Sequence, residues 1–222
     1  MKRIGIIAAL PGELKPLTIG WQQRGRFFIG KVGEAECIAI AGGMGAAAAA
    51  AACEQLLGEG PIDALVSYGW AGALSCGLKP PAACAIYEVI DSRTGERFVT
   101  DLPSGQRLVT LDHVARSNEK RSLAEKFQAP LVDMEAAAVA RYAAARNLPF
   151  YCYKGISDGY NDNLPDFNRF LDSDGQLRMS ALVIYALLRP AYWGALQRMG
   201  KQSQAAARNL ATIVTENIGR TL

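Results

Sequence analysis

Histidine and paired cysteines are the first things that this sequence lacks. Among 222 residues there is one histidine, His113, and the five cysteines stand singly, without close paired spacing. One imidazole excludes multi-histidine metal centres, and isolated cysteines exclude the common zinc and redox motifs. We therefore expect no metal and no organic cofactor. The odd number of cysteines favours a reducing, cytoplasmic location.

Long hydrophobic runs and strong net charge are also missing. The N-terminal apolar run, which ends at Leu10, is at the short limit for a signal peptide, and a buried first strand explains it more simply. The longest later run, residues 181–188, is far shorter than the ~20 residues that span a bilayer. A net charge of +3 without a long basic run argues against nucleic acid as a partner, so a small-molecule ligand is expected.

Half of the residues are hydrophobic, which is enough for the core of a single domain over residues 1–222. Short β-branched segments alternate with helical ones, and this alternation predicts a layered α/β fold. A hairpin around Lys31-Val-Gly-Glu34 makes the sheet mixed, so we expect a three-layer αβα sandwich with a central mixed sheet. The expected strands span 3–9, 27–32, 37–41, 64–68, 85–90, 107–111 and 150–156, and the expected helices span 45–57, 117–127 and 135–146.

The composition changes from about residue 176, where a basic C-terminal extension begins. This segment has six basic residues and one acid, Glu216, so it carries +5 while the rest of the chain carries −2. Its pattern is helical, and Pro190 is expected to divide it into two helices. The interpretation that we favour is a solvated packing helix. The alternative is a basic, aromatic-bearing surface that makes peripheral contact with anionic lipid at the inner face of a membrane.

Polar residues follow several of the expected strands, where layered α/β proteins bind their ligands. Pro11-Gly-Glu13 follows the first strand, and Ser157-Asp158 follows a late one. The glycine turns do not have the G-x-G-x-x-G spacing of a dinucleotide site, and no phosphate-binding P-loop is present. The remaining strand ends carry Gly42-Gly-Met-Gly45 and Gly69-Trp-Ala-Gly72.

Four motifs in order carry a family resemblance. They are Ile4-Gly-Ile-Ile-Ala-Ala-Leu-Pro-Gly-Glu13, Gly69-Trp-Ala-Gly-Ala-Leu74, Val132-Asp-Met-Glu-Ala-Ala-Ala-Val139 and Gly155-Ile-Ser-Asp158. Over residues 1 to about 170 the chain resembles the nucleoside phosphorylase and nucleosidase superfamily, nearest its methylthioadenosine/S-adenosylhomocysteine nucleosidase branch. The resemblance implies a nucleoside phosphorylase-like fold, a homo-oligomer, and cleavage of the N-glycosidic bond of an adenosine-like nucleoside.

A finer resemblance rests on the end of the chain. Asp158-Gly-Tyr-Asn-Asp-Asn-Leu-Pro165, Leu171-Asp-Ser-Asp-Gly175 and Leu187-Leu-Arg-Pro190 resemble the hopanoid-associated phosphorylase subgroup. That subgroup removes adenine from adenosylhopane, so the resemblance implies a role in hopanoid biosynthesis and a large hydrocarbon at the 5′ position.

The family resemblance also implies roles for charged residues. Asp158 matches the acid that protonates the leaving base, with Ser157 as its hydrogen-bonding neighbour. Glu135 matches the carboxylate that binds the ribose hydroxyls, and Met134 packs on the sugar. Glu13 matches the carboxylate that activates water in the hydrolytic branch. Each residue also has a purely structural interpretation, as a turn cap, a first-turn acid or a solvated carboxylate. Asp133 replaces the glutamate common before Met-Glu, and no role is assigned to it.

The turns are expected to line the same site. The resemblance places Gly69, Trp70, Ala71, Gly43 and Met44 around the ribose and its 5′ side, where missing side chains permit close backbone approach. It places the segment 111–115, with Val114, over the base, and leaves His113 without a catalytic role.

Two alternatives stay open from the sequence alone. A phosphorylase would use phosphate as co-substrate, and the chain offers Gly12, Lys15 and the distant Arg93 for phosphate but no arginine beside Glu13. A non-catalytic nucleoside-binding module of the same fold would bind adenine without turnover. The presence of all three carboxylates favours an enzyme, and the acid at position 13 favours hydrolysis.

Overall fold

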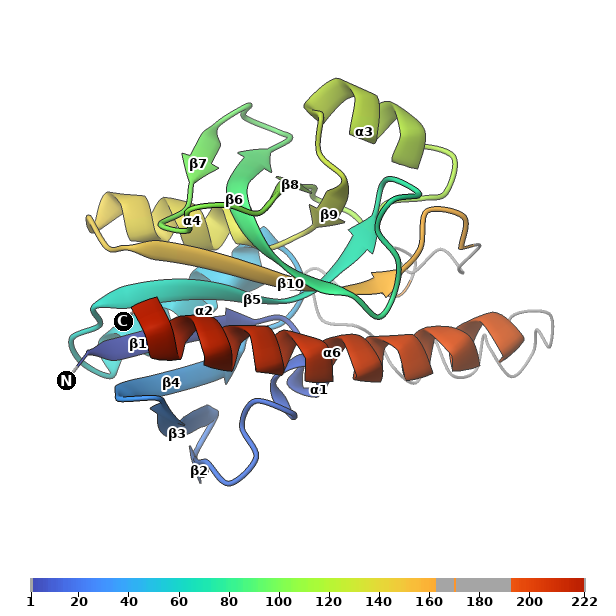
Figure 1. Ribbon diagram of the computed structural model, residues 1–222. Coiled ribbons are helices and arrows are strands. Elements are labelled where there is room, and N and C mark those ends of the chain that lie inside the picture. The colour runs from blue at the N-terminus through green and yellow to red at the C-terminus, as the bar shows by residue number, and fades with distance from the viewer. Residues whose placement is uncertain (1, 163–169, 171–192, 222) are drawn as a thin grey trace.

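The computed structural model describes residues 2–162, 170 and 193–221. In these residues ten strands form one mixed sheet, with the order β10-β6-β8-β9-β5-β1-β4-β3-β2 and β7 paired to β6 (Figure 1). The chain runs in the order β1 (Arg3–Ala8), α1 (Pro11–Leu14), β2 (Gln22–Arg24), β3 (Phe27–Val32), β4 (Ala35–Ala41), α2 (Ala46–Gly58), β5 (Ala64–Ala73), β6 (Ala83–Asp91), β7 (Arg97–Val99), β8 (Gln106–Thr110), α3 (Lys120–Phe127), β9 (Leu131–Asp133), α4 (Ala136–Ala145), β10 (Phe150–Asp158) and α6 (Trp193–Thr221).

Half of the sheet closes on itself. Strand β10 pairs with β6 on one side and with β5 on the other, so β10, β6, β8, β9 and β5 form a ring. Beyond β5, the strands β1 and β4 run parallel to it, and the β3–β4 hairpin lies antiparallel. The ring gathers the carboxyl ends of β5, β9 and β10 at one place, beside the carboxyl end of β1.

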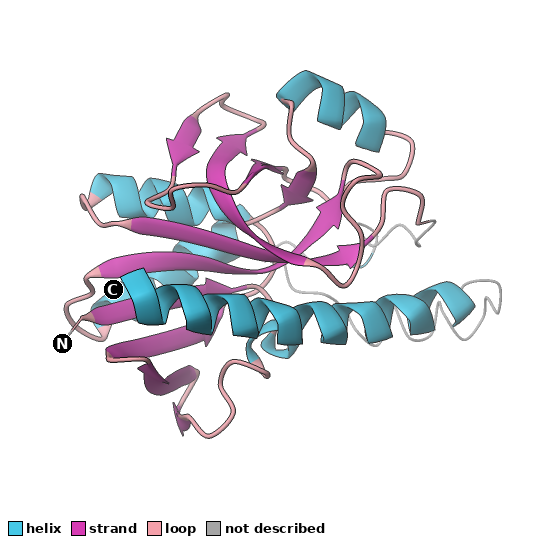
Figure 2. Ribbon diagram, viewed as in Figure 1, coloured by secondary structure: helices cyan, strands magenta, loops and turns pink. Residues whose placement is uncertain are grey.

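Helices cover both faces of the sheet (Figure 2). On one face, small residues of α2 and α4 pack on the strands, as in the contact of Ala49 and Ala137 with Ile7, Leu65 and the other members of this core cluster. On the other face, α6 crosses the strands and buries one side of its length, with Leu210 and Val214 fully buried. The expected α/β fold with a central mixed sheet is therefore confirmed.

Most elements lie where the sequence predicts them, within a few residues. The expected hairpin is the β3–β4 pair. The short elements β2, β7, β9 and α1 were not predicted, because three or four residues carry too little periodic pattern to identify. Pro190 and the first of the two expected C-terminal helices lie outside the described residues. The second corresponds to α6, and no helix in the described part of the chain has the length and apolar character of a membrane span.

Strand β10 is irregular at its end. Residues 152, 154 and 156 face α4, whereas Tyr153 and Gly155 face α6. The pairing with β5 then shifts between Ile156 and Asp158, so that Ser157 is an extra residue in the strand. Such a bulge re-aims the side chains beside it. Here it lets two consecutive residues, Ser157 and Asp158, face the same cavity.

Candidate active site

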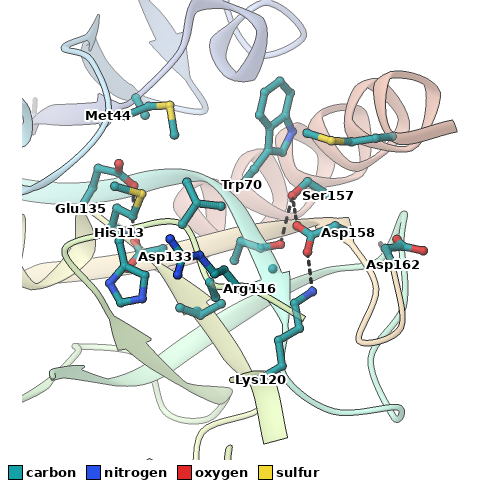
Figure 3. Close-up of a pocket in the computed structure, with 18 of the residues that line it drawn as sticks. Met44, Trp70, His113, Arg116, Lys120, Asp133, Glu135, Ser157, Asp158 and Asp162 are labelled. Carbon is teal, nitrogen blue, oxygen red and sulfur yellow. Dashed lines mark hydrogen bonds and ion pairs between the residues drawn. The ribbon is translucent and has the colours of Figure 1, made fainter. Parts of the chain in front are cut away.

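A cavity of about 440 Å³ opens beside the carboxyl ends of β1, β5, β9 and β10. Its wall brings together residues that lie far apart in the sequence (Figure 3). Nine of the eleven site residues predicted from the sequence line it: Glu13, Met44, Trp70, Ala71, Val114, Met134, Glu135, Ser157 and Asp158.

Glu13 lies in α1 and is almost completely buried, with 3% of its surface exposed. Its Oε2 atom accepts hydrogen bonds from the backbone N–H groups of Ala9 and Leu10, both at 2.8 Å, and Oε1 accepts one from Trp70, also at 2.8 Å. Burial raises the pKa of Glu13, although these backbone bonds and the charge of Lys154 oppose the rise. The result is a fixed carboxylate of increased basicity.

Glu135 precedes the first turn of α4. Its Oε1 atom accepts a hydrogen bond of 2.6 Å from the backbone N–H of Gly45, and Oε2 accepts a longer one of 3.3 Å from Met134. Burial raises the pKa of Glu135 to about 8, and the nearby charge of Asp133 adds to the rise, while Lys154 opposes it. A carboxyl group that accepts only two backbone hydrogen bonds keeps lone pairs for a ligand.

Asp158 ends β10, and its carboxylate is held at both oxygens. The hydroxyl of Ser157 donates to Oδ1 at 2.9 Å, and the ammonium of Lys120 donates to Oδ2 at 2.7 Å. The Asp158 side chain is only 16% exposed, so the end of the strand is shielded from solvent. Figure 3 shows Glu135 and Asp158 at opposite sides of the same cavity, which leaves space between them for a small molecule.

The two remaining predicted residues lie behind the wall. Gly69 supports Glu13, because a Cβ atom at this position would lie 2.8 Å from Glu13 Oε1. Gly43 has a positive φ of 115° and donates its backbone N–H to Ala9 at 3.0 Å, which joins the turn to the end of β1. These glycines shape the cavity through the backbone and do not face the ligand space.

Several lining residues were not predicted. Lys120 and Arg116 come from the segment around the start of α3, whose sequence indicates only a helix cap. Met199 comes from α6 and joins Trp70 and Met44 in an apolar part of the wall. The indole N–H of Trp70 donates to the backbone oxygen of Ser203 at 3.0 Å, so Trp70 also links β5 to α6. Nothing in the sequence of the C-terminal segment indicates that it reaches the cavity.

Asp133 has a structural role that the sequence did not indicate. Its Oδ2 atom lies 2.8 Å from the Lys154 ammonium and accepts the backbone N–H of Ala136 at 2.9 Å, while Oδ1 accepts the hydroxyl of Thr110 at 2.7 Å. Asp133 therefore fixes the start of α4, where Glu135 lies. His113 also lines the cavity, half-exposed, and its ring nitrogens contact Asp112 and Glu119. The Asp112 contact is the main cause of its raised pKa.

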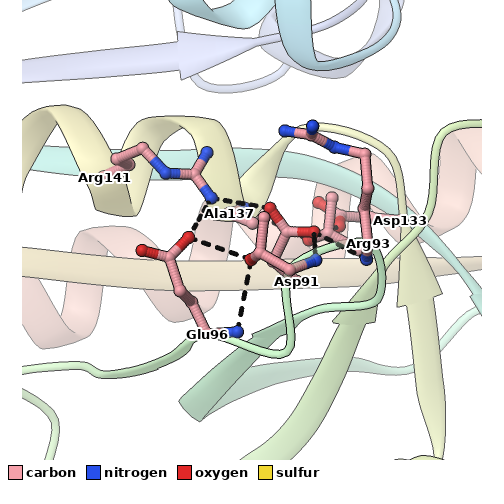
Figure 4. A network of polar contacts seen from close by, with 8 residues as sticks. Asp91, Arg93, Glu96, Asp133, Ala137 and Arg141 are labelled. Atoms are coloured by element: carbon pink, nitrogen blue, oxygen red, sulfur yellow. Dashed lines mark hydrogen bonds and ion pairs between the residues drawn. The ribbon is translucent and has the colours of Figure 1, made fainter.

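Arg93, considered above for phosphate, is not among the cavity residues. It belongs to a separate polar network (Figure 4), in which its backbone N–H donates to Asp91 and Asp91 pairs with Arg141. Lys15 is exposed and also lies outside the cavity wall. Within the described residues, no group of three or more His, Cys, Asp or Glu side chains is arranged to hold a metal ion.

Known proteins resemble this chain in sequence and in fold. A curated relative, the 5′-methylthioadenosine/S-adenosylhomocysteine nucleosidase of Buchnera aphidicola, is 26% identical over 211 residues, covering 77% of this chain and 84% of the relative. The S-adenosylhomocysteine nucleosidase of Streptococcus pyogenes superposes with a TM-score of 0.74 at 17% identity, covering 100% of this chain and 98% of that one. The futalosine hydrolase of Helicobacter pylori superposes with a TM-score of 0.71 at 15% identity, covering 98% of this chain and 97% of that one.

The family model of the phosphorylase superfamily matches residues 3–113 and 105–189. This chain belongs to the phosphorylase superfamily.

Proposed function

We propose that the protein is a nucleosidase that hydrolyses the N-glycosidic bond of an adenosine-like nucleoside and releases adenine. The observation that carries this proposal is the convergence of Glu13, Glu135 and Asp158, from three separate elements, on one cavity. The similarity to two nucleosidases and to a futalosine hydrolase supports a hydrolytic reaction of this class.

The proposed reaction uses each carboxyl group once. As the bond between ribose C1′ and the purine nitrogen breaks, its electron pair passes to the base and positive charge develops on the sugar. The Asp158 carboxyl gives its proton to the base, so that the base leaves in neutral form. The oxygen of a water molecule bonds to C1′, and Glu13 accepts a proton from that water. Glu135 accepts hydrogen bonds from the ribose hydroxyls and fixes the sugar between the two.

The environment of Glu13 supports its role as the base. A carboxylate has about four lone-pair sites, and three backbone N–H groups occupy three of them. One site remains to accept a hydrogen bond from water. Because burial raises the pKa of Glu13, the carboxylate is a better proton acceptor than an exposed one.

The distribution of cations favours water over phosphate. In the described part of the wall, the basic residues are His113, Arg116 and Lys120, all from one segment, whereas Glu13 comes from α1. Lys120 is already paired with Asp158. A phosphate bound near Glu13 would meet a buried negative charge, which disfavours the phosphorylase reaction.

The apolar part of the wall supports a hydrophobic group at the 5′ position of the substrate. Leu10, Met44, Trp70 and Met199 line this part, and flexible methionine side chains adapt to irregular apolar ligands. We infer that the substrate carries a large apolar 5′ substituent, and adenosylhopane, implied by the sequence resemblance, is the proposed example. Homo-oligomerisation and a cytoplasmic location stay predictions.

The experiment is an assay of adenine release from a panel of 5′-substituted adenosines, with phosphate omitted and then restored. We expect release without phosphate, no change on adding it, and faster turnover of substrates with long apolar 5′ groups. Release that depends on phosphate would identify a phosphorylase. Binding of adenine without any turnover would favour the non-catalytic alternative.

Membrane contact by α6 needs a separate test. The apolar face of α6 packs on the sheet, and among its described side chains the exposed basic residues Arg198, Lys201 and Arg208 would attract anionic lipid. Removing the helix would also remove core residues such as Leu210. We therefore propose charge reversal of the three basic residues to glutamate. Loss of binding to anionic vesicles, with neutral vesicles as control, would support the contact, and binding unchanged by the reversal would contradict it.

A further inference from the structure

Lys120 is a buried cation that the reaction described above does not use. It is the first residue of α3, and only 2% of its surface is exposed, although it borders the cavity. Its ammonium donates to Asp158 Oδ2 and to the backbone oxygen of Gly159, both at 2.7 Å (Figure 3). Burying an ammonium group without a partner destabilises the folded protein, because the charge loses its hydration. A buried lysine at this position therefore requires an acceptor such as Asp158.

The contact with Asp158 has a chemical consequence. When a carboxylic acid gives its proton to a leaving base, negative charge appears on its oxygens. A fixed cation beside those oxygens stabilises that charge more in the transition state than before proton transfer begins. Lys120 is placed where this charge develops, and its bond to Gly159 holds it there without relying on the ligand.

The two donors to Asp158 differ in kind. Ser157 is a neutral hydroxyl on the same strand, and Lys120 is a cation from a different element. Behind Asp158, a Cβ atom on Gly72 would lie 3.1 Å from Oδ2, so β5 closes off that side. The carboxyl group therefore has a fixed orientation. The other charged or titratable residues that line the cavity with this pair are Glu13, His113, Arg116, Asp133, Glu135 and Asp162.

We propose that Lys120 is a positioning residue that orients Asp158 and stabilises the carboxylate that forms as Asp158 protonates the leaving base. The proton moves from Asp158 to the base, and the carboxylate that results is stabilised by its ion pair with Lys120. This inference rests on the proposed nucleosidase function. A lysine that only capped α3, or only linked α3 to β10, would not take part in the reaction in this way.

The test compares two leaving groups in the variant Lys120→Met. A purine must be protonated to leave, whereas 4-nitrophenolate leaves a 4-nitrophenyl riboside without a proton. We expect kcat for the purine nucleoside to fall about 10²-fold, as when one donor to a developing anion is removed, while KM and the rate with the nitrophenyl riboside stay nearly unchanged.

Three further variants keep the result interpretable. Lys120→Arg retains the positive charge and should restore part of the rate. Lys120→Gln retains a hydrogen-bond donor without the charge, so it should fold and still show the selective loss. Lys126→Met, an exposed lysine of the same helix, is the matched control and should behave as wild type.

The possible results distinguish a failure of the proposed role of Lys120 from a failure of the proposed nucleosidase function. Equal losses with both leaving groups, or no loss with either, would overturn the role of Lys120 while leaving the nucleosidase proposal intact. Failure of the wild-type protein to release adenine from any adenosine derivative would overturn the proposed function itself, and the role of Lys120 with it.

Discussion

The ammonium of Lys154 lies 2.8 Å from the carboxylate of Asp133 beneath the cavity, and neither side chain is more than 2% exposed. Burial alone would lower the pKa of Lys154, but the negative charge of Asp133 and its neighbours outweighs this and raises it. The same lysine lowers the pKa values of Glu13 and Glu135 against the effect of burial. One buried cation thus interacts favourably with the negative charge of three buried carboxyl groups.

Removing this cation should destabilise the protein. We expect Lys154→Met to lower the free energy of unfolding by about 3–5 kcal/mol, because it leaves Asp133 as an uncompensated buried charge. The double variant Lys154→Met/Asp133→Leu should lose less than the single one. Denaturant unfolding measures both, and Arg121→Met, which breaks an exposed pair on α3, is the control with no resolvable change. A single variant as stable as wild type would contradict this view of the pair.

The raised pKa of Glu135 predicts how stability depends on pH. The carboxyl titrates at 4.5 when unperturbed and at about 8 in the folded protein, mainly because of burial. Between these values the folded state binds the extra proton, so this contribution is fully present below pH 4.5 and is lost as the pH rises through about 8. Unfolding free energies measured across this range should decline less in Glu135→Gln than in wild type. Parallel curves for the two proteins would show that Glu135 does not titrate in this way.

Gly69 predicts a loss of activity without a matching loss of fold. In Gly69→Ala the new methyl group would lie 2.8 Å from Glu13 Oε1, so the carboxylate must move. A displacement of this kind costs roughly 10²-fold in rate when it misplaces a catalytic group. Steady-state kinetics measures the loss, and circular dichroism checks the fold. Gly58→Ala, at an open position at the end of α2, should keep full activity.

Asp158→Asn tests the proposed acid directly. The amide keeps the size of the side chain but has no carboxyl proton to give, so kcat for adenine release should fall by about 10²–10⁴-fold. Glu125→Gln, an exposed carboxyl change on α3, serves as the control. Near wild-type turnover in Asp158→Asn would place the proton donor elsewhere.

Trp70 predicts selectivity at the 5′ position. Trp70→Ala removes a large part of the apolar wall, so KM for adenosines with long apolar 5′ groups should rise about tenfold. This change corresponds to about 1.4 kcal/mol, near the lower end of the ~1.5–3 kcal/mol gained by burying one large apolar side chain. KM for adenosine itself should change less. Trp70→Phe keeps the ring but loses the bond to Ser203, and it should show a smaller effect. Equal changes for all substrates would argue against an apolar 5′ site.

The sequence predicts those parts of the fold and site that depend on local pattern. Hydrophobic periodicity locates the long strands and helices, and the strand ends indicate that Glu13 and Asp158 lie together. The family resemblance adds Glu135 to this site. Glu13 lies in the short helix after β1, Glu135 precedes α4 and Asp158 ends β10, so the fold determines their positions.

Features that depend on long-range packing could not be predicted. Lys120 and Asp158 are far apart in sequence, and nothing local shows that α3 docks against the end of β10. The pairing of β10 with both β5 and β6 closes a ring that strand patterns alone do not specify. Met199 reaches the cavity only because α6 crosses the whole sheet, whereas its composition indicates a solvated helix.

The bulge at Ser157 makes the hydroxyl and the acid contiguous in the chain, which a regular strand would send to opposite sides. Their mutual contact therefore survives any motion that separates α3 from the sheet, and only the Lys120 contact is sensitive to such motion. Evolution can exchange the loop and helix that carry the lysine without rebuilding the two-residue unit that delivers the acid.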